Sequence, residues 1–254
     1  MDSETLTAFI EYLWDFDGSM VDNLMIIRNG YLLVEAYFYP FSKDSKHDIA
    51  SVTKSFTSSL IGIAIDKGYI RDVEEHVLDF FPDRTITNLD VNKQALTLEH
   101  LLTMQTGFDC IAEPAEITLM EMIDSPDWVQ FALDLPMSEK PGKSYTYCSS
   151  GAHLLSAILS QSTDMSTLEF SREYLFEPLG ISDVIWPTDP QGVNRGYGDL
   201  CITTEDLAKL GYLYLYHGNW DSQQVLSDAW INSATDIQVN VSEEMGLILL
   251  QRVV

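Results

Sequence analysis

The chain has 254 residues, of which 46% are hydrophobic, so it can bury a full core as one domain or as a domain with a large insertion. Its 39 acidic residues outnumber 14 basic ones, giving a formal net charge of −25. Because phosphate binding needs clustered basic side chains, this charge argues against nucleic acid and anionic membrane surfaces as partners. The sequence also lacks an apolar run of about 18 residues, the length that a membrane span requires.

The N-terminal part predicts a helix followed by a hairpin. Residues 5–16 carry apolar side chains at helical spacing, which predicts a short amphipathic helix. Residues 24–28 and 31–39 are rich in β-branched and aromatic side chains and are joined by Asn29-Gly30, a strong hairpin signal. These residues therefore predict the first two strands of an antiparallel sheet.

Residues 49–67 predict a buried helix, apolar nearly all round, with Ser51 and Lys54 at its head. Residues three apart on a helix share a face, so the lysine amine can reach the serine hydroxyl. Desolvation disfavours a charged amine, and a neutral lysine can activate a serine nucleophile without a histidine. The helix N-terminus also favours developing negative charge. By itself, however, S-x-x-K is a common tetrapeptide.

From Tyr69 to about Arg195 the pattern indicates helices separated by turns rich in Pro, Gly and Asp. The better helical runs are residues 98–104, 118–133 and 152–161, and a further helix is predicted from Thr203 to Gly218. A structural helical protein with chance motifs is one interpretation of such a pattern.

Residues 141–151 form a second chemical cluster, in which Tyr147 and Ser149 are the candidate site residues. A phosphate loop ending at Gly142 is excluded, because its first glycine would fall at Met137. A tyrosine hydroxyl beside a lysine can pass a proton between nucleophile and leaving group. Taken by itself, a tyrosine such as Tyr147 is more often a core residue with a satisfied hydroxyl.

The cysteines and histidines predict neither a disulfide framework nor a metal site. Cys110, Cys148 and Cys201 are odd in number and contain no C-x-x-C pair, which favours a reducing compartment. The five histidines show no H-E-x-x-H or similar spacing, so no metal is expected. Because the N-terminus lacks the pattern of a signal peptide, the sequence as it stands predicts a cytoplasmic protein, or a periplasmic or secreted one if a signal peptide was removed.

Four motifs occur in order along the chain. They are Ala50-Ser51-Val52-Thr53-Lys54-Ser55, His100-Leu101-Leu102-Thr103 with Thr106-Gly107, Pro141-Gly142 with Tyr145-Thr146-Tyr147-Cys148-Ser149, and Gly198 with Thr203-Thr204-Glu205-Asp206-Leu207-Ala208. Together they resemble the β-lactamase-related serine hydrolases, which include class C β-lactamases, D-alanyl-D-alanine carboxypeptidases, family VIII carboxylesterases and 6-aminohexanoate-dimer hydrolases. The similarity covers about residues 22 to 233.

The resemblance implies roles for the candidate residues. Ser51 would be the nucleophile that forms an acyl-enzyme, Lys54 the neighbouring base, and Tyr147 the proton donor to the leaving group. The substrate would be a small ester, amide or peptide-like molecule, with no metal or organic cofactor.

The resemblance also implies a fold of the α+β class: an antiparallel sheet flanked by helices, with an inserted helical domain. Residues 1–75 plus 196–254 would form the sheet domain and residues 76–195 the mainly helical insertion, with the site in the cleft between them.

Two departures from the family pattern change these expectations. Ser149 replaces the usual asparagine of the Y-x-N motif, and its shorter side chain favours an esterase or small-amide hydrolase over a β-lactamase. No late K-T-G, H-x-G or G-x-G strand follows Trp230, which predicts a sheet incomplete at the C-terminus, as in a truncated homologue, with residues 237–241 and 246–254 as substitute strands.

An incomplete sheet has two further consequences. An uncovered edge would favour self-association. The resemblance implies that one late strand supplies the second N–H of the oxyanion hole, and loss of that donor would weaken turnover. A penicillin-binding-like or inactive ligand-binding homologue is therefore the alternative function.

Overall fold

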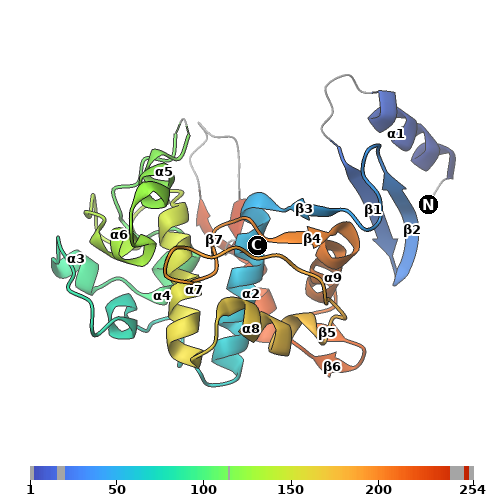
Figure 1. Ribbon diagram of the computed structural model, residues 1–254. Coiled ribbons are helices and arrows are strands. Elements are labelled where there is room, and N and C mark those ends of the chain that lie inside the picture. The colour runs from blue at the N-terminus through green and yellow to red at the C-terminus, as the bar shows by residue number, and fades with distance from the viewer. Residues whose placement is uncertain (1–2, 16–20, 114, 241–248, 252–254) are drawn as a thin grey trace.

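The computed structural model describes residues 3–15, 21–113, 115–240 and 249–251 (Figure 1). The helices are α1 Ser3–Asp15, α2 Thr53–Asp66, α3 Val91–Gln94, α4 Leu98–Leu102, α5 Ile117–Asp124, α6 Trp128–Asp134, α7 Ser149–Thr163, α8 Thr167–Ser171, α9 Thr204–Leu215 and α10 Asp228–Thr235. Shorter helical turns are Ala50–Val52 and Val77–Phe80, and Arg172–Phe176 forms a π-helical turn. The strands are β1 Asn23–Arg28, β2 Tyr31–Tyr37, β3 Lys46–Asp48, β4 Cys201–Thr203, β5 Asn219–Trp220, β6 Gln223–Gln224, β7 Ile237–Asn240 and β8 Leu249–Gln251.

Helix α2 occupies the centre of the molecule, and every residue from Thr53 to Ala64 is buried (Figure 1). Its apolar side chains, such as Phe56 and Leu60, belong to the main hydrophobic core. The predicted buried helix over residues 49–67 is therefore confirmed, with one difference. Ser51 lies in the 3₁₀ turn that precedes the α-helix rather than in the α-helix itself.

Helix α7 lies beside α2, and the shorter helices α4, α5 and α6 pack against its other side (Figure 1). The predicted helix over 118–133 is present as two helices, α5 and α6, because Pro126 interrupts it. Asp127 then caps the second helix by accepting a hydrogen bond from the Gln130 backbone N–H at 2.9 Å. Both helices pack against α7, and Leu119 of α5 lies beside the same pocket as Tyr147.

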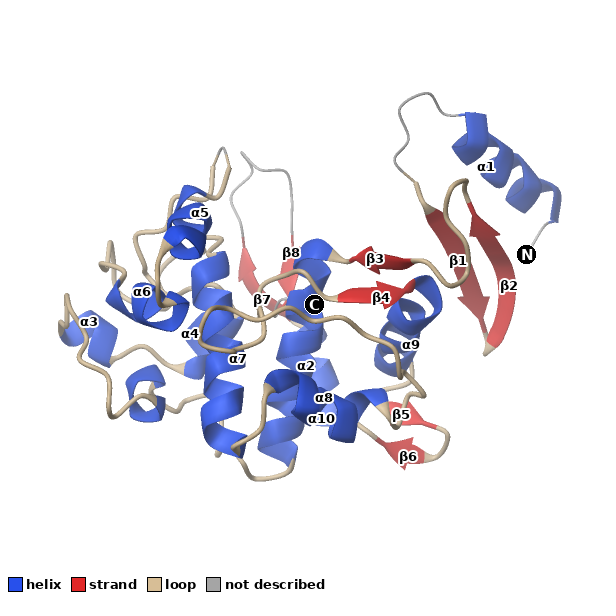
Figure 2. Ribbon diagram, in the orientation of Figure 1, coloured by secondary structure: helices blue, strands red, loops and turns tan. Residues whose placement is uncertain are grey.

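The strands of the described residues form four two-stranded antiparallel sheets, β1–β2, β3–β4, β5–β6 and β7–β8. The first pair confirms the predicted hairpin: Arg28 pairs with Tyr31, and Asn29 and Gly30 both have positive φ, which the tight turn requires. This hairpin and α1 lie together at one end of the molecule, away from the central helices (Figure 2).

The C-terminal segment contains strands in part of the predicted positions. Residues Ile237–Asn240 and Leu249–Gln251 pair with each other in antiparallel fashion. Residues 241 and 246–248, and the final residues 252–254, belong to the same predictions but lie outside the described residues.

The predicted division into domains at residues 75/76 and 195/196 stays a prediction. A single cluster of buried side chains contains residues from both predicted parts, including Phe56, Leu101 and Leu210. Within the described ranges, no helix combines the length and the apolar character needed to cross a bilayer.

Candidate active site

Three polar side chains meet at the head of α2. The hydroxyl oxygen of Ser51 lies 2.7 Å from that of Tyr147, and Lys54 Nζ lies 2.9 Å from each of them. Every pair in this triangle is thus within hydrogen-bond distance. The structure brings together a potential nucleophile, a base and a proton carrier from two segments 93 residues apart.

The three residues differ in their access to solvent. Ser51 is exposed, Tyr147 is half-buried, and Lys54 is only 2% exposed. A substrate can therefore reach the serine hydroxyl from outside while the lysine stays within the protein. This arrangement suits a nucleophile, Ser51, that is exposed to substrate and is activated by a base, Lys54, on its buried side.

A third polar contact of Lys54 comes from a residue to which the sequence assigned no role. Lys54 Nζ donates a hydrogen bond to the backbone carbonyl of Tyr197 at 2.8 Å. Tyr197 belongs to the segment between Trp186 and Leu200, which we call the bridging loop. The turn-forming glycines of this loop are visible in the sequence, but a backbone carbonyl has no sequence signature.

Tyr147 is held by main-chain contacts on its N-terminal side. The Thr146 N–H donates to the Met104 carbonyl at 3.0 Å, and the Gly142 N–H donates to the Gln105 carbonyl at 2.8 Å. Helix α7 begins immediately afterwards, at Ser149. The segment that carries the phenol is therefore fixed between the end of α4 and the start of α7.

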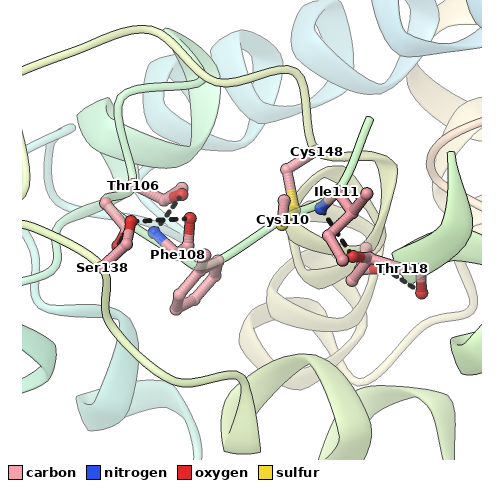
Figure 3. Close-up of a disulfide and its surroundings, with 9 residues drawn as sticks. Thr106, Phe108, Cys110, Ile111, Thr118, Ser138 and Cys148 are labelled. Carbon is pink, nitrogen blue, oxygen red and sulfur yellow. Dashed lines mark hydrogen bonds between the residues drawn. A yellow bond between two sulfur atoms is a disulfide. The ribbon is translucent and has the colours of Figure 1, made fainter. Parts of the chain in front are cut away.

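A disulfide bond joins Cys110 to Cys148, the residue next to Tyr147 (Figure 3). The prediction against disulfide bonding is therefore wrong for these two cysteines. The two positions are 38 residues apart, so spacing rules for local pairs do not detect them, whereas the fold brings their Cα atoms to 5.8 Å. Cys201 is a free thiol.

The disulfide connects the Tyr147 segment to a loop that is itself well ordered by hydrogen bonds (Figure 3). In that loop the Phe108 N–H donates to Thr106 Oγ1 at 3.2 Å, and the Ile111 N–H donates to Thr118 Oγ1 at 2.8 Å. Gly107 has φ +73°, and a Cβ there would lie 2.4 Å from the Glu139 carbonyl oxygen, so only glycine fits.

An open pocket of about 550 Å³ adjoins Tyr147. Its other lining residues are Ala112, Glu113, Ala115, Glu116 and Leu119. The pocket thus offers small apolar surfaces and two carboxylates beside the phenol. Its size is in the range of pockets that bind small molecules.

Ser149, the predicted substrate-binding residue, is 2% exposed. Its hydroxyl oxygen has no hydrogen-bond partner among the described residues. The lining of the pocket beside Tyr147 does not include it. A substrate contact from Ser149 stays a prediction.

Two tyrosines near the site, Tyr145 and Tyr197, have raised pKa values. Burial raises the pKa of Tyr145 to about 12, and burial likewise raises the pKa of Tyr197 to about 12, with a further contribution from Asp199. Both phenols therefore lose their protons only well above neutral pH. In the described part of the chain, no three His, Cys, Asp or Glu side chains gather as a metal site would require.

The fold and this site resemble those of known proteins. The chain matches the beta-lactamase family model over residues 10–243, so it belongs to the β-lactamase family of serine hydrolases. It is 24% identical over 227 residues to the 6-aminohexanoate-dimer hydrolase of Paenarthrobacter ureafaciens, covering 85% of this chain and 57% of the relative. The chain thus spans little more than half the length of that relative.

Two solved structures show the same fold. A Bacillus anthracis protein assigned as a 6-aminohexanoate-dimer hydrolase has a TM-score of 0.79 at 20% identity, covering 91% of this chain and 64% of that one. An octameric penicillin-binding protein homologue from Pyrococcus abyssi has a TM-score of 0.75 at 22% identity, covering 100% of this chain and 64% of that one. The α+β, β-lactamase/transpeptidase-like fold predicted from the sequence is therefore confirmed.

Proposed function

We propose that the protein is a serine hydrolase that cleaves a small ester or amide through an acyl-Ser51 intermediate. The observation that carries this proposal is the triangle of Ser51 Oγ, Lys54 Nζ and Tyr147 Oη, with separations of 2.7 to 2.9 Å. Membership of the β-lactamase family supports the same reaction class.

The contacts of Lys54 suggest how the serine is activated. A neutral amine has two N–H bonds and one lone pair. Donating to Tyr147 and to the Tyr197 carbonyl uses both hydrogens and leaves the lone pair for the proton of Ser51. The Ser51 oxygen then bonds to the substrate carbonyl carbon, and the C=O electron pair moves onto the carbonyl oxygen. The N–H groups and the dipole at the head of α2 favour that negative charge.

Tyr147 completes the proton transfer. As the tetrahedral intermediate collapses, the bond to the leaving alkoxide or amine breaks, and the leaving group takes the Tyr147 proton. Lys54, 2.9 Å away, returns the proton it received from Ser51 to the phenol. Water then attacks the acyl carbon, and the same groups carry protons in reverse to release the acid and restore Ser51.

The pocket beside Tyr147 supports a small substrate rather than a polymer. Ser149 in place of asparagine favours an ester or simple amide over a β-lactam, because the shorter side chain reaches less far toward a substrate carbonyl. Comparing hydrolysis of p-nitrophenyl acetate, a short anilide and a chromogenic cephalosporin ranks the three classes, and we expect the ester to be fastest.

The decisive experiment is labelling with a fluorophosphonate, followed by peptide mapping. We expect the label on Ser51, and Lys54→Ala should slow labelling at least about 100-fold because the proton acceptor is gone. Lys43→Ala is the matched control, since that lysine side chain is 60% exposed and lies on the surface, and it should label within about twofold of the native rate. Reversible binding of a fluorescent penicillin with no covalent label would instead support the ligand-binding alternative.

We also propose that the β1–β2 hairpin associates with a strand of another copy. Within the described residues these strands pair only with each other, and Tyr31, Leu32 and Leu33 on β2 are exposed. Light scattering across a concentration series tests this: a mass that stays at one chain argues against it.

The Cys110–Cys148 bond supports an oxidising compartment over the cytoplasm that the cysteine count favoured. Thiol trapping in intact cells tests the proposal, because a cytoplasmic protein would present all three thiols to the reagent.

A further inference from the structure

The bridging loop, residues 186–200, forms polar contacts with both α2 and α7, the two helices that lie side by side in Figure 1. On the α2 side, Lys54 Nζ donates to the Tyr197 carbonyl at 2.8 Å and Thr57 Oγ1 donates to the Gly196 carbonyl at 2.9 Å. Two consecutive carbonyls of the loop therefore face α2. The position of the loop decides where Lys54 finds its backbone acceptor.

On the α7 side, the loop is attached by a buried polar pair. His153 Nε2 lies 3.1 Å from Asp189 Oδ2, and both side chains are fully buried. Close by, Ser156 Oγ donates to the Asn194 carbonyl at 2.7 Å. His153 and Ser156 are three residues apart and lie on the same face of α7.

Asp189 also shapes the loop itself. Its Oδ1 accepts the backbone N–H of Gln191 at 2.8 Å and that of Val193 at 2.9 Å. Burial alone would raise the pKa of this carboxyl, but the hydrogen bonds from His153 and from the Val193 and Gln191 N–H groups bring it below its usual value. The ionised carboxylate thus joins α7 to the turn of the loop.

Packing transmits this attachment to Tyr197. The ring centroids of His153 and Tyr197 are 6.1 Å apart, and the ring of Trp128 packs against both. His153 Nδ1 has no hydrogen-bond partner among the described residues, so the contact with Asp189 is the directional bond that orients the imidazole.

Gly196 reinforces this contact between the loop and α7. A Cβ at this position would lie 2.8 Å from Ser156 Cβ and 3.0 Å from the Ala152 carbonyl oxygen. The backbone of the loop therefore lies directly on the helix, with no room to shift toward it.

We propose that His153 and Asp189 are positioning residues for the Ser51 reaction: they hold the bridging loop on α7 so that the Tyr197 carbonyl stays on Lys54 Nζ. This inference rests on the proposed hydrolase function. His153 and Asp189 are buried and act through the loop, because neither side chain touches any of the three reacting side chains. Losing the pair should therefore slow acylation without changing how the pocket binds a reagent.

The test separates binding from chemistry in fluorophosphonate labelling of the full chain. His153→Phe removes the bond to Asp189 while filling the space, and we expect the maximal labelling rate constant, kinact, to fall about tenfold with the half-saturating concentration unchanged within twofold. His153→Gln places an amide N–H near the position of Nε2, and it should retain kinact within about threefold. His153→Leu makes the same test with a smaller side chain where phenylalanine does not fold.

Ser150→Ala is the matched control. Ser150 is buried on the same helix, but its hydroxyl contacts the Thr118 carbonyl at 3.4 Å instead of the bridging loop. It should leave kinact unchanged, with circular dichroism giving the folded fraction of each variant.

Two results would overturn the inference: a folded His153→Phe or His153→Leu protein with native kinact, or a His153→Gln protein as slow as the apolar variants. If the native chain carries no label on Ser51 at all, the proposed function fails instead, so the two failures are distinguishable.

Discussion

The centre of the molecule and its N-terminal end contain similar amounts of apolar side chain but bury very different fractions of it. Along α2, twelve consecutive residues from Thr53 to Ala64 are buried. In α1 no residue is buried, and in the β1–β2 hairpin only Val34 is, at 8% exposure. Trp14 is 66% exposed and Tyr31 is 73% exposed.

The difference comes from neighbours rather than from local propensity. Helix α2 is covered by α7, by the Arg172–Phe176 turn and by the bridging loop, each from a distant part of the chain. The hairpin faces mainly α9, across an open pocket of about 490 Å³ lined by Met25, Leu32, Tyr212 and others. A well-formed hairpin therefore does not guarantee a core, because burial requires surfaces that the strands themselves do not provide.

The largest expected effect on stability is the loss of the disulfide within the well-packed part. Replacing Cys110 and Cys148 by serine frees a loop of 38 residues, and the chain-entropy model then predicts a decrease of about 4 kcal/mol in the free energy of unfolding. Urea denaturation of both forms measures it. Cys201→Ser is the control and should change stability by less than about 0.5 kcal/mol; equal effects of the two changes would contradict the prediction.

Truncating one leucine in each region tests the comparison most directly. Leu60 on α2 is 0% exposed, so Leu60→Ala should cost about 3 kcal/mol through lost contacts and a residual cavity. Leu33 on β2 is 43% exposed, so Leu33→Ala should cost less than about 0.5 kcal/mol. Both values come from denaturant midpoints at concentrations where the chain is monomeric. A large loss at Leu33 under those conditions would show that another part of the same chain covers the hairpin in solution.

A pair of glycines sharpens the comparison at the level of a single methyl group. A Cβ at Gly62 in α2 would lie 2.5 Å from the ring of Trp230, so Gly62→Ala should destabilise the protein by about 2 kcal/mol. At Gly211 in α9 no atom lies within 4 Å of the added Cβ, so Gly211→Ala should stabilise by about 0.5 to 1 kcal/mol. Thermal unfolding gives both signs, and a shared sign would refute the contrast.

The smallest expected effect concerns pH. Burial raises the pKa of Tyr214, whose hydroxyl lies 2.9 Å from Ser59 Oγ, from 10.0 to about 12. The folded state therefore keeps a proton that the unfolded state loses, and stability present below pH 10 is lost as the pH rises to about 12. The native chain should lose stability faster than Tyr214→Phe, by on the order of 1 kcal/mol per pH unit. Parallel slopes for the two proteins in alkaline urea titrations would contradict this assignment.

Sequence reasoning located the candidate site better than it located the supports of that site. Ser51 and Lys54 are close in the chain, so helical spacing alone brings them together. Tyr147 was found through an ordered motif rather than through geometry. The bridging loop was assigned no role, because it contributes a carbonyl oxygen and the carboxylate of Asp189, whose partner His153 lies on α7. Neither spacing nor residue type marks these groups.

Local patterns in the amino-acid sequence determined the hairpin at Asn29-Gly30, the apolar α2 and the charge balance that disfavours polyanionic partners, because each depends on neighbours within a few residues or on composition alone. Only the tertiary structure decided that Cys110 meets Cys148, that Lys54 meets the Tyr197 carbonyl and that the hairpin stays exposed. These outcomes depend on contacts between residues far apart in the chain, and such contacts are set by how the helices and loops pack together rather than by local sequence spacing.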